Sequence, residues 1–240
     1  MQLRRFTHLK APMTTIVFPI YDEVTQLDFT VPHQFLTMIP DLKVIVASVG
    51  GADINAQGLV FSNLADLEEI EECDVLCTPG GLGVVAAIEN ECYMNAVRKL
   101  AKKATYLTSV CSGSLVLAAA GVLKGHRAAC HWAWRDMLAD FGVEPDAGRI
   151  VRDGNIITGG GVTAGADFSL ALLAELRGPE TAQAVQLALE YAPAPPFNSG
   201  RPETAPAPLR EAVQAQMNQL LGDGRRRIGL VAKQLNEATA

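Results

Sequence analysis

The fold of this chain is decided by the stretch YLTSVCSGSLVLAAAG, residues 106–121. Its first five residues suit a buried strand, and the apolar run that follows favours a helix ended by glycine. Cys111 therefore stands where a strand turns into a helix, among small residues that permit a tight turn. Free N–H groups at a helix N-terminus favour a thiolate, which predicts a lowered pKa and a nucleophile. The alternative is an inert cysteine of the core.

Strands and helices alternate on both sides of this stretch. Strand patterns occupy residues 14–20, 42–49, 59–61, 75–78, 106–110, 127–130, 149–152 and 155–158. Helical patterns begin at Pro32 and occupy residues 91–103, 115–120, 132–141, 164–176 and 179–191. Such alternation predicts an α/β fold, with a doubly wound, mostly parallel sheet covered on both faces.

Four separate stretches are expected to meet at one edge of this sheet. Cys111, the Gly80–Gly81 pair and the Gly159–Gly161 run all follow strands, and Asp28 follows the first strand after a turn. Small molecules bind beyond the carboxyl ends of parallel strands. This edge is therefore the predicted site.

Asp28 lies between apolar residues in the approach to the helix expected from Pro32. A buried carboxyl near a thiolate has a raised pKa, so that it can donate a proton and later accept one from water. The alternative is a helix cap.

The composition narrows the function classes. The chain has 240 residues, a net charge of −6 and a pI near 5.3, which argue against a general nucleic-acid surface. No window reaches the roughly 20 apolar residues of a membrane span. Residues 1–13 lack the apolar centre of a secretory signal and are predicted to be a loose tail, so the cytoplasm is the expected compartment. The five cysteines include no C-x-x-C pair, and no disulfide framework is expected.

Cofactor motifs are weak. The segments GLGVVA (81–86) and GGGVTA (159–164) match a dinucleotide fingerprint, but no acid ends a strand about 20 residues after either. Close backbone approach to a small ligand explains these glycines better. The four histidines show no metal-ligand spacing, so no metal is predicted. His131, next to Trp132, is either a site residue or a core histidine.

The C-terminal part has a different composition. Residues 192–208 are proline-rich, and helical patterns follow at 209–220 and from Ile228. We expect one α/β domain over residues 14–191, and a segment 192–240 whose helices pack on that domain or on a second subunit.

The motifs together resemble the ThiJ/PfpI family of the class I glutamine amidotransferase-like superfamily, in particular its isocyanide hydratases. The stretches that carry the resemblance are VTQLD (24–28), TPGG (78–81), TSVCSGSLVL (108–117), TGGGVTAGADF (158–168) and LEYAPAPPFN (189–198). The resemblance implies a homodimeric, cofactor-free, flavodoxin-like protein that hydrates isocyanides to N-substituted formamides.

The same resemblance implies roles for individual residues. Cys111 would attack the isocyanide carbon, and Asp28 would protonate the adduct to a thioimidate and then activate water. Ser112 would hydrogen-bond near Asp28 and the sulfur. Substrate or water would be held at Gly81, Gly160, Val162 and His131.

The chain departs from the family pattern in informative places. Ser112 replaces an expected threonine, and Val31 replaces an expected glycine, which narrows the pocket. Asp28 replaces the glutamate of the chaperone and deglycase branch, and the residue after Cys111 is not histidine, which disfavours a protease-like pair.

Three other functions stay open: a glyoxalase- or deglycase-type enzyme, a peroxide sensor, and a ligand-sensing domain like those of AraC-type regulators. The segment after Pro208 is too short for the helix-turn-helix region of such regulators.

Overall fold

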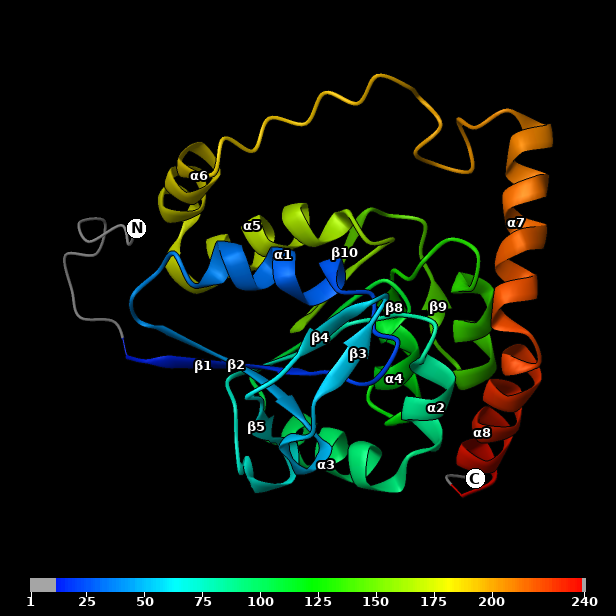
Figure 1. Ribbon diagram of the computed structural model, residues 1–240, viewed down its shortest axis with the longest axis horizontal. Helices are drawn as coiled ribbons and strands as arrows, with labels where there is room; N and C mark the ends of the chain where they lie inside the picture. Colours follow the sequence, from blue (N-terminus) through cyan, green and yellow to red (C-terminus); the bar gives the residue numbers. More distant parts are fainter. Residues whose placement is uncertain (1–11, 239–240) are drawn as a thin grey trace.

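The computed structural model describes residues 12–238, and a seven-stranded sheet forms its centre (Figure 1). The strand order is β10-β11-β7-β6-β1-β2-β5, and every neighbouring pair is parallel except the β10–β11 hairpin. The strands are β1 (Thr14–Pro19), β2 (Leu42–Ser48), β5 (Ala65–Asp66), β6 (Val75–Thr78), β7 (Tyr106–Val110), β10 (Ile150–Asp153) and β11 (Ile156–Gly159). The predicted α/β class with a mostly parallel sheet is confirmed.

Helices cover both faces of the sheet (Figure 1). One layer contains α1 (Leu27–Leu36), α5 (Ala164–Arg177) and α6 (Pro179–Ala188), and the other contains α2 (Val84–Glu89), α3 (Glu91–Ala101) and α4 (Gly113–Ala119). Short 3₁₀ helices are η1 (Val49–Gly51), η2 (Leu67–Glu69) and η3 (Arg135–Phe141). Two small sheets pair β3 (Ile54–Ala56) with β4 (Leu59–Phe61) and β8 (Arg127–Ala128) with β9 (Glu144–Pro145).

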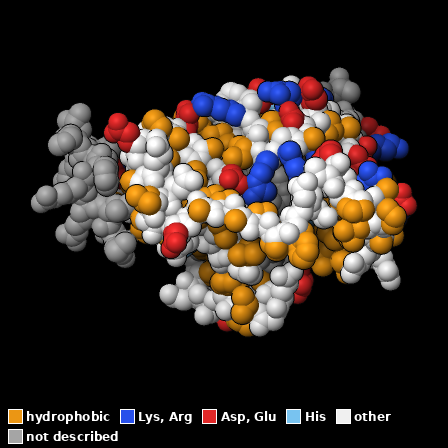
Figure 2. All heavy atoms as spheres, turned by 90° about the horizontal axis from the view of Figure 1, so that it is seen from above, with side chains coloured by type: hydrophobic (Ala, Val, Ile, Leu, Met, Phe, Trp, Pro, Cys, Tyr) orange, Lys and Arg blue, Asp and Glu red, His pale blue; other side chains and the backbone are white. Residues whose placement is uncertain are grey.

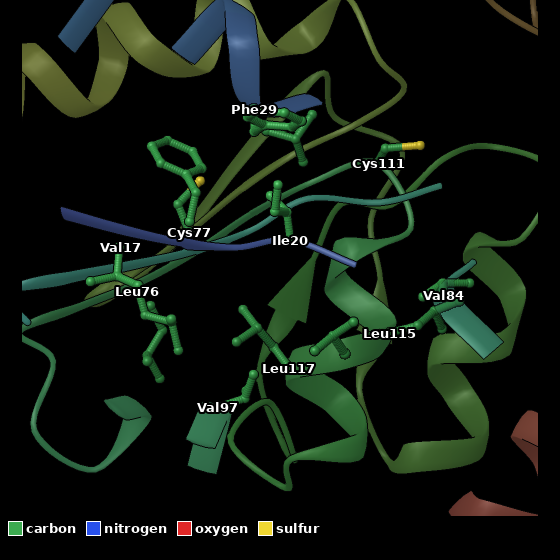
Figure 3. Packing of buried hydrophobic residues seen from close by; sticks show 14 of the residues in the cluster. Val17, Ile20, Phe29, Leu76, Cys77, Val84, Val97, Cys111, Leu115 and Leu117 are labelled. Atoms are coloured by element: carbon green, nitrogen blue, oxygen red, sulfur yellow. The ribbon is translucent and has the colours of Figure 1, made fainter. Parts of the chain in front are cut away.

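Apolar side chains pack on both sides of the sheet (Figure 3). Phe29 lies on the side of α1, while Leu115, Leu117 and Val97 lie on the side of α3 and α4. All four residues are almost completely buried. Cys111 stands at the border of this core with its sulfur directed away from it, so the packed core holds the turn that carries the thiol.

The start of the first helix differs from the prediction. Helix α1 begins at Leu27, so Pro32 lies inside it and Asp28 is its second residue. A proline in the helix interior lacks one N–H donor. The turn from Thr25 and Gln26 already starts the helix, since the N–H of Asp28 donates to Thr25 at 2.9 Å. The helix-cap interpretation of Asp28 is wrong, because Gln26 is the N-cap residue and no side chain caps it.

Two other predicted helices are shorter than expected. Residues 132–141 contain only the 3₁₀ helix η3, because the segment before it forms tight turns around His131 instead. The N–H of Trp134 donates to the His131 carbonyl, and the N–H of Ala133 donates to the His131 ring. Helix α6 ends at Ala188, shortly before Glu190, whose φ of +51° is incompatible with a continuing helix.

The C-terminal segment crosses the molecule before it packs (Figure 1). A strap, residues 192–206, runs from α6 to α7 (Ala207–Leu221), and α8 (Gly224–Ala238) follows. Helix α8 lies on the body through buried Ile228 and Ala232, and Arg227 forms an ion pair with Glu89 of α2. The predicted tail 1–13 falls almost entirely outside the described residues. Within residues 12–238, no helix combines the length and apolar character needed to cross a bilayer.

Candidate active site

Cys111 lies at a sharp turn between β7 and α4. Its φ is +61°, a left-handed value that is rare for residues other than glycine. Its N–H donates to the carbonyls of Gly159 at 3.1 Å and Gly160 at 2.8 Å, and these two bonds hold the turn against the end of β11.

Gly113 lets helix α4 begin close to the neighbouring strand. A Cβ at this position would lie 2.0 Å from the carbonyl oxygen of Thr78, at the end of β6. The absence of a side chain thus brings the first turn of α4 against the segment that follows β6.

Asp28 enters the site from α1 and is completely buried. Its Oδ2 accepts a hydrogen bond from the N–H of Gly80 at 2.9 Å. Its Oδ1 is buried and has no hydrogen-bond partner among the described residues. A Cβ on Gly80 would lie 2.5 Å from the Ser112 nitrogen and 3.0 Å from Oδ2 of Asp28. Only glycine therefore permits this carboxyl to approach the turn.

Ser112 links the cysteine turn to the Gly80–Gly81 pair. Its Oγ accepts a hydrogen bond from the N–H of Gly81 at 3.0 Å. Gly81 has a φ of +146° and forms a β-bridge with Val24, where a Cβ would lie 2.4 Å from the Glu23 carbonyl oxygen. The N–H of Gly81 is thus occupied, and Gly81 holds the loop that leads to Asp28.

The pKa of Cys111 is raised, whereas the sequence predicted a lowered pKa. Burial raises the pKa of Cys111, and the nearby Asp28 carboxyl raises it further, while the N–H groups of Ser112 and Val162 lower it. Among the described residues, no cation contributes to this shift. The prediction considered the helix N-terminus alone, but desolvation in the full fold is the larger effect.

Asp28 has a shifted pKa of its own. Burial raises the pKa of its carboxyl to about 7, against the lowering effect of the hydrogen bond from the Gly80 N–H and of the neighbouring Cys111 thiol. Near neutral pH the carboxyl therefore titrates while the neighbouring Cys111 thiol keeps its proton, and the two groups form one coupled pair. Such a pair can release a proton to a substrate and take one back.

A cavity of about 230 Å³ opens beside the turn. It is lined by Cys130, His131, Trp132, Arg135, Ala147, Gly148, Arg149, Gly160, Gly161, Val162, Thr163, Gly200, Arg201, Pro202 and Glu203. Of the predicted substrate-binding residues, Gly160, Val162 and His131 line this cavity, and Gly81 does not.

The lining residues differ in what they can offer a ligand. The N–H of Gly160 donates to the Arg149 carbonyl at 2.9 Å and is occupied, whereas that of Val162 is directed at the Cys111 sulfur. Burial lowers the pKa of His131 to about 4, so this ring is neutral at physiological pH. Its Nδ1 accepts a hydrogen bond from the Ala133 N–H at 3.3 Å, which leaves the rest of the ring as a cavity wall.

The sequence patterns did not indicate Arg135, Arg149 or Arg201. They lie in a predicted helix, a hairpin strand and the proline-rich segment, and only the fold brings them to one cavity. No three His, Cys, Asp or Glu side chains between residues 12 and 238 are placed to hold a metal ion.

The fold and the site define a flavodoxin-like α/β protein with a cysteine at the strand-to-helix turn, facing a buried carboxyl. The DJ-1/PfpI family model matches residues 14–175, and the chain belongs to this family.

Two relatives share most of its length. The chain is 48% identical over 193 residues to an isonitrile hydratase of Pseudomonas putida, which covers 80% of this chain and 85% of that protein. A ThiJ/PfpI family protein from Pseudomonas syringae has a crystal structure that superposes with a TM-score of 0.85 at 37% identity, covering 91% of this chain and 90% of that one.

More distant relatives share part of the chain. The regulator CdhR of Pseudomonas aeruginosa is 30% identical over 142 residues, which span 58% of this chain and 41% of the regulator. Drosophila melanogaster DJ-1beta shares the fold, with a TM-score of 0.66 at 24% identity over 75% of this chain and 99% of that one.

Proposed function

We propose that this protein hydrates isocyanides to N-substituted formamides without a cofactor. The observation that carries the proposal is the completely buried Asp28 carboxyl, whose Oδ1 has no hydrogen-bond partner among the described residues, beside the Cys111 thiol at the strand-to-helix turn. The similarity to an isonitrile hydratase over most of the chain supports the same reaction, since isonitrile and isocyanide name one functional group.

The first half of the reaction forms a thioimidate. The pair starts with one proton, which lies on the Cys111 thiol. Asp28 takes this proton as the sulfur bonds to the terminal isocyanide carbon and delivers it to the same carbon. The product is R–N=CH–S–Cys111, with Asp28 ionised. We assign this proton transfer to Oδ1, which has no hydrogen-bond partner among the described residues.

The second half adds water. The Asp28 carboxylate removes a proton from a water molecule as the oxygen attacks the thioimidate carbon. The C–S bond then breaks, the nitrogen gains a proton and the hydroxyl loses one, which yields R–NH–CHO. The proton returns to the Asp28–Cys111 pair, so one water is consumed and nothing is oxidised or reduced.

The remaining site residues have supporting roles in this proposal. The N–H groups of Ser112 and Val162 stabilise the sulfur when it carries charge. The Ser112 hydroxyl positions Gly81, while Gly160 and His131 form the wall beside the substrate. We also propose that the protein is a homodimer and that it is cytoplasmic. Size-exclusion chromatography with light scattering tests the dimer directly.

The test is turnover of cyclohexyl isocyanide, followed by NMR detection of the formamide. We expect Cys111→Ala to lose about 10³-fold or more, and Asp28→Asn to lose on the order of 10²–10⁴-fold. Cys92→Ala is the matched control, because Cys92 is exposed and lies on α3.

Two results would contradict the proposal. Turnover that survives in Cys111→Ala removes the nucleophile assignment. Consumption of methylglyoxal by a wild-type protein that ignores isocyanides supports a glyoxalase or deglycase function instead.

A further inference from the structure

The cavity beside Cys111 has a basic wall that the reaction steps do not use. Arg135 comes from η3, Arg149 precedes β10, and Arg201 comes from the strap, and all three line the same cavity. Figure 2 looks down on the face crossed by the strap and shows Lys and Arg side chains gathered beside a hollow near its centre.

These three guanidinium groups are only partly neutralised. Arg149 forms an ion pair with Asp167 and donates to the Thr163 carbonyl at 2.9 Å. Arg201 donates only a long hydrogen bond of 3.4 Å, to the Ala147 carbonyl. The Arg135 guanidinium has no ion pair with a carboxylate of the described residues, and its charge lowers the pKa of the neighbouring Cys130 thiol.

The other titratable side chains of the cavity do not cancel this charge. Glu203 is the acidic residue of the lining, and the Cys130 thiol has a pKa of about 12 because it is buried. His131 is neutral. Because Arg149 is paired with Asp167, two arginines, Arg135 and Arg201, face the Glu203 carboxylate of the lining. Guanidinium groups without a carboxylate partner in a partly enclosed space bind carboxylates well.

The cavity is placed to receive the side chain of the reacting molecule. The Gly160 carbonyl accepts a hydrogen bond from the Cys111 N–H, and the Val162 N–H is directed at the sulfur. Gly160 and Val162 also line the cavity, so the cavity adjoins the cysteine turn. Cys111 itself is not a lining residue, so the cavity is a candidate site for the R group of the bound isocyanide and not for the reacting carbon. The volume of about 230 Å³ admits a compact group only.

We infer that the preferred substrates are small isocyanides whose side chain carries a carboxylate, bound by Arg135 and Arg201. This inference rests on the proposed function for the reaction and adds the substrate class.

The test compares 4-isocyanobenzoate with its methyl ester. For the wild type, kcat/KM should favour the carboxylate by about tenfold or more, and the preference should shrink at high ionic strength. In Arg135→Gln and Arg201→Gln the ratio of the two kcat/KM values should fall at least about fivefold each. Because the intrinsic reactivity of each substrate is the same in every variant, the change in this ratio isolates the arginines. Arg152→Gln is the control, since Arg152 pairs with Glu175 outside the cavity and should keep the ratio.

A second measurement separates this inference from the proposed reaction. Binding of the product 4-formamidobenzoate and of its methyl ester, measured by calorimetry, requires no turnover. Hydration of the ester at least as fast as the carboxylate, or a ratio unchanged in both arginine variants, overturns the inference and leaves the reaction standing. Arginine-dependent binding of the product without hydration of any isocyanide supports the anion pocket and removes the reaction. If neither hydration nor arginine-dependent binding of the product is detected, the proposed reaction and the anion pocket are both contradicted.

Discussion

The carboxyl of Asp28 and the thiol of Cys111 lie close enough to shift each other's pKa, although Asp28 comes from α1 on one face of the sheet and Cys111 from the turn that leads to α4 on the other. Asp28 is held by the N–H of Gly80, and Cys111 is held by the carbonyls of Gly159 and Gly160. Two strained or glycine-dependent turns therefore bring together two acids that each have a raised pKa. The chemistry and the stability of the protein both depend on where the proton of this pair lies.

The pH profile of hydration should report this pair. Below about pH 7 the Asp28 carboxylate gains a proton and can no longer take the proton of the Cys111 thiol, so kcat/KM for a neutral isocyanide should fall about tenfold per pH unit. Steady-state rates from about pH 5 to 8.5 measure the limb. A midpoint of this acidic limb near pH 4 would show that Asp28 has an ordinary pKa and would contradict its coupling to Cys111. Cys92→Ala should keep the wild-type profile.

Asp28→Asn should stabilise the protein at alkaline pH. The carboxyl has a folded-state pKa of about 7 against about 3.9 unfolded, so the folded state binds the extra proton between these values. The free energy of unfolding therefore falls as pH rises from about 4 to 7 and then levels off. Asparagine does not ionise, and the gain at pH 8 should be on the order of 1–3 kcal/mol, shrinking towards pH 5.

Urea unfolding at both pH values measures this difference. Asp153→Asn is the control, because the Arg127 N–H lowers the pKa of this partly exposed carboxyl, and its replacement should bring no gain at pH 8. An Asp28→Asn protein that is less stable than the wild type at pH 8 would show that the ionised carboxylate is well accommodated.

Gly113→Ala should prevent the normal packing of α4 on β6. The new Cβ would lie 2.0 Å from the Thr78 carbonyl oxygen, and backbone has to move to remove this contact. We expect a loss of about 3 kcal/mol or more of unfolding free energy, measured by denaturant titration. The control Gly229→Ala, inside α8 with open space around its Cβ, should gain about 0.5–1 kcal/mol. Equal stabilities for the two variants would contradict the close approach.

Helix α8 should contribute to the stability of the body through Ile228. This side chain is buried, so Ile228→Ala should cost about 2–4 kcal/mol of unfolding free energy. Leu230, which is about half exposed at 49%, provides the matched control, and Leu230→Ala should cost under about 0.5 kcal/mol. Thermal unfolding of both variants measures the difference. A negligible effect of Ile228→Ala would mean that α8 does not pack on the body.

Sequence patterns predicted the α/β class, the strand-to-helix turn at Cys111 and the edge where four segments meet. These features depend on neighbours along the chain: β-branched runs make strands, small residues make tight turns, and the carboxyl ends of parallel strands share an edge. The stretch 106–121 thus determined the position of the candidate nucleophile by itself. The motif resemblance pointed to the family for the same reason, since its motifs are short and continuous.

Other features were decided only by the tertiary structure. The start of α1 at Leu27, the raised pKa of Cys111 and the cavity wall of Arg135, Arg149 and Arg201 could not be predicted from local patterns. Burial and electrostatic interaction are sums over residues that are distant in sequence, so the turn at Cys111 predicted a thiolate while the complete fold favours a protonated thiol. The residues of that turn determined where the thiol lies, and the packing around it decided that the thiol keeps its proton at neutral pH.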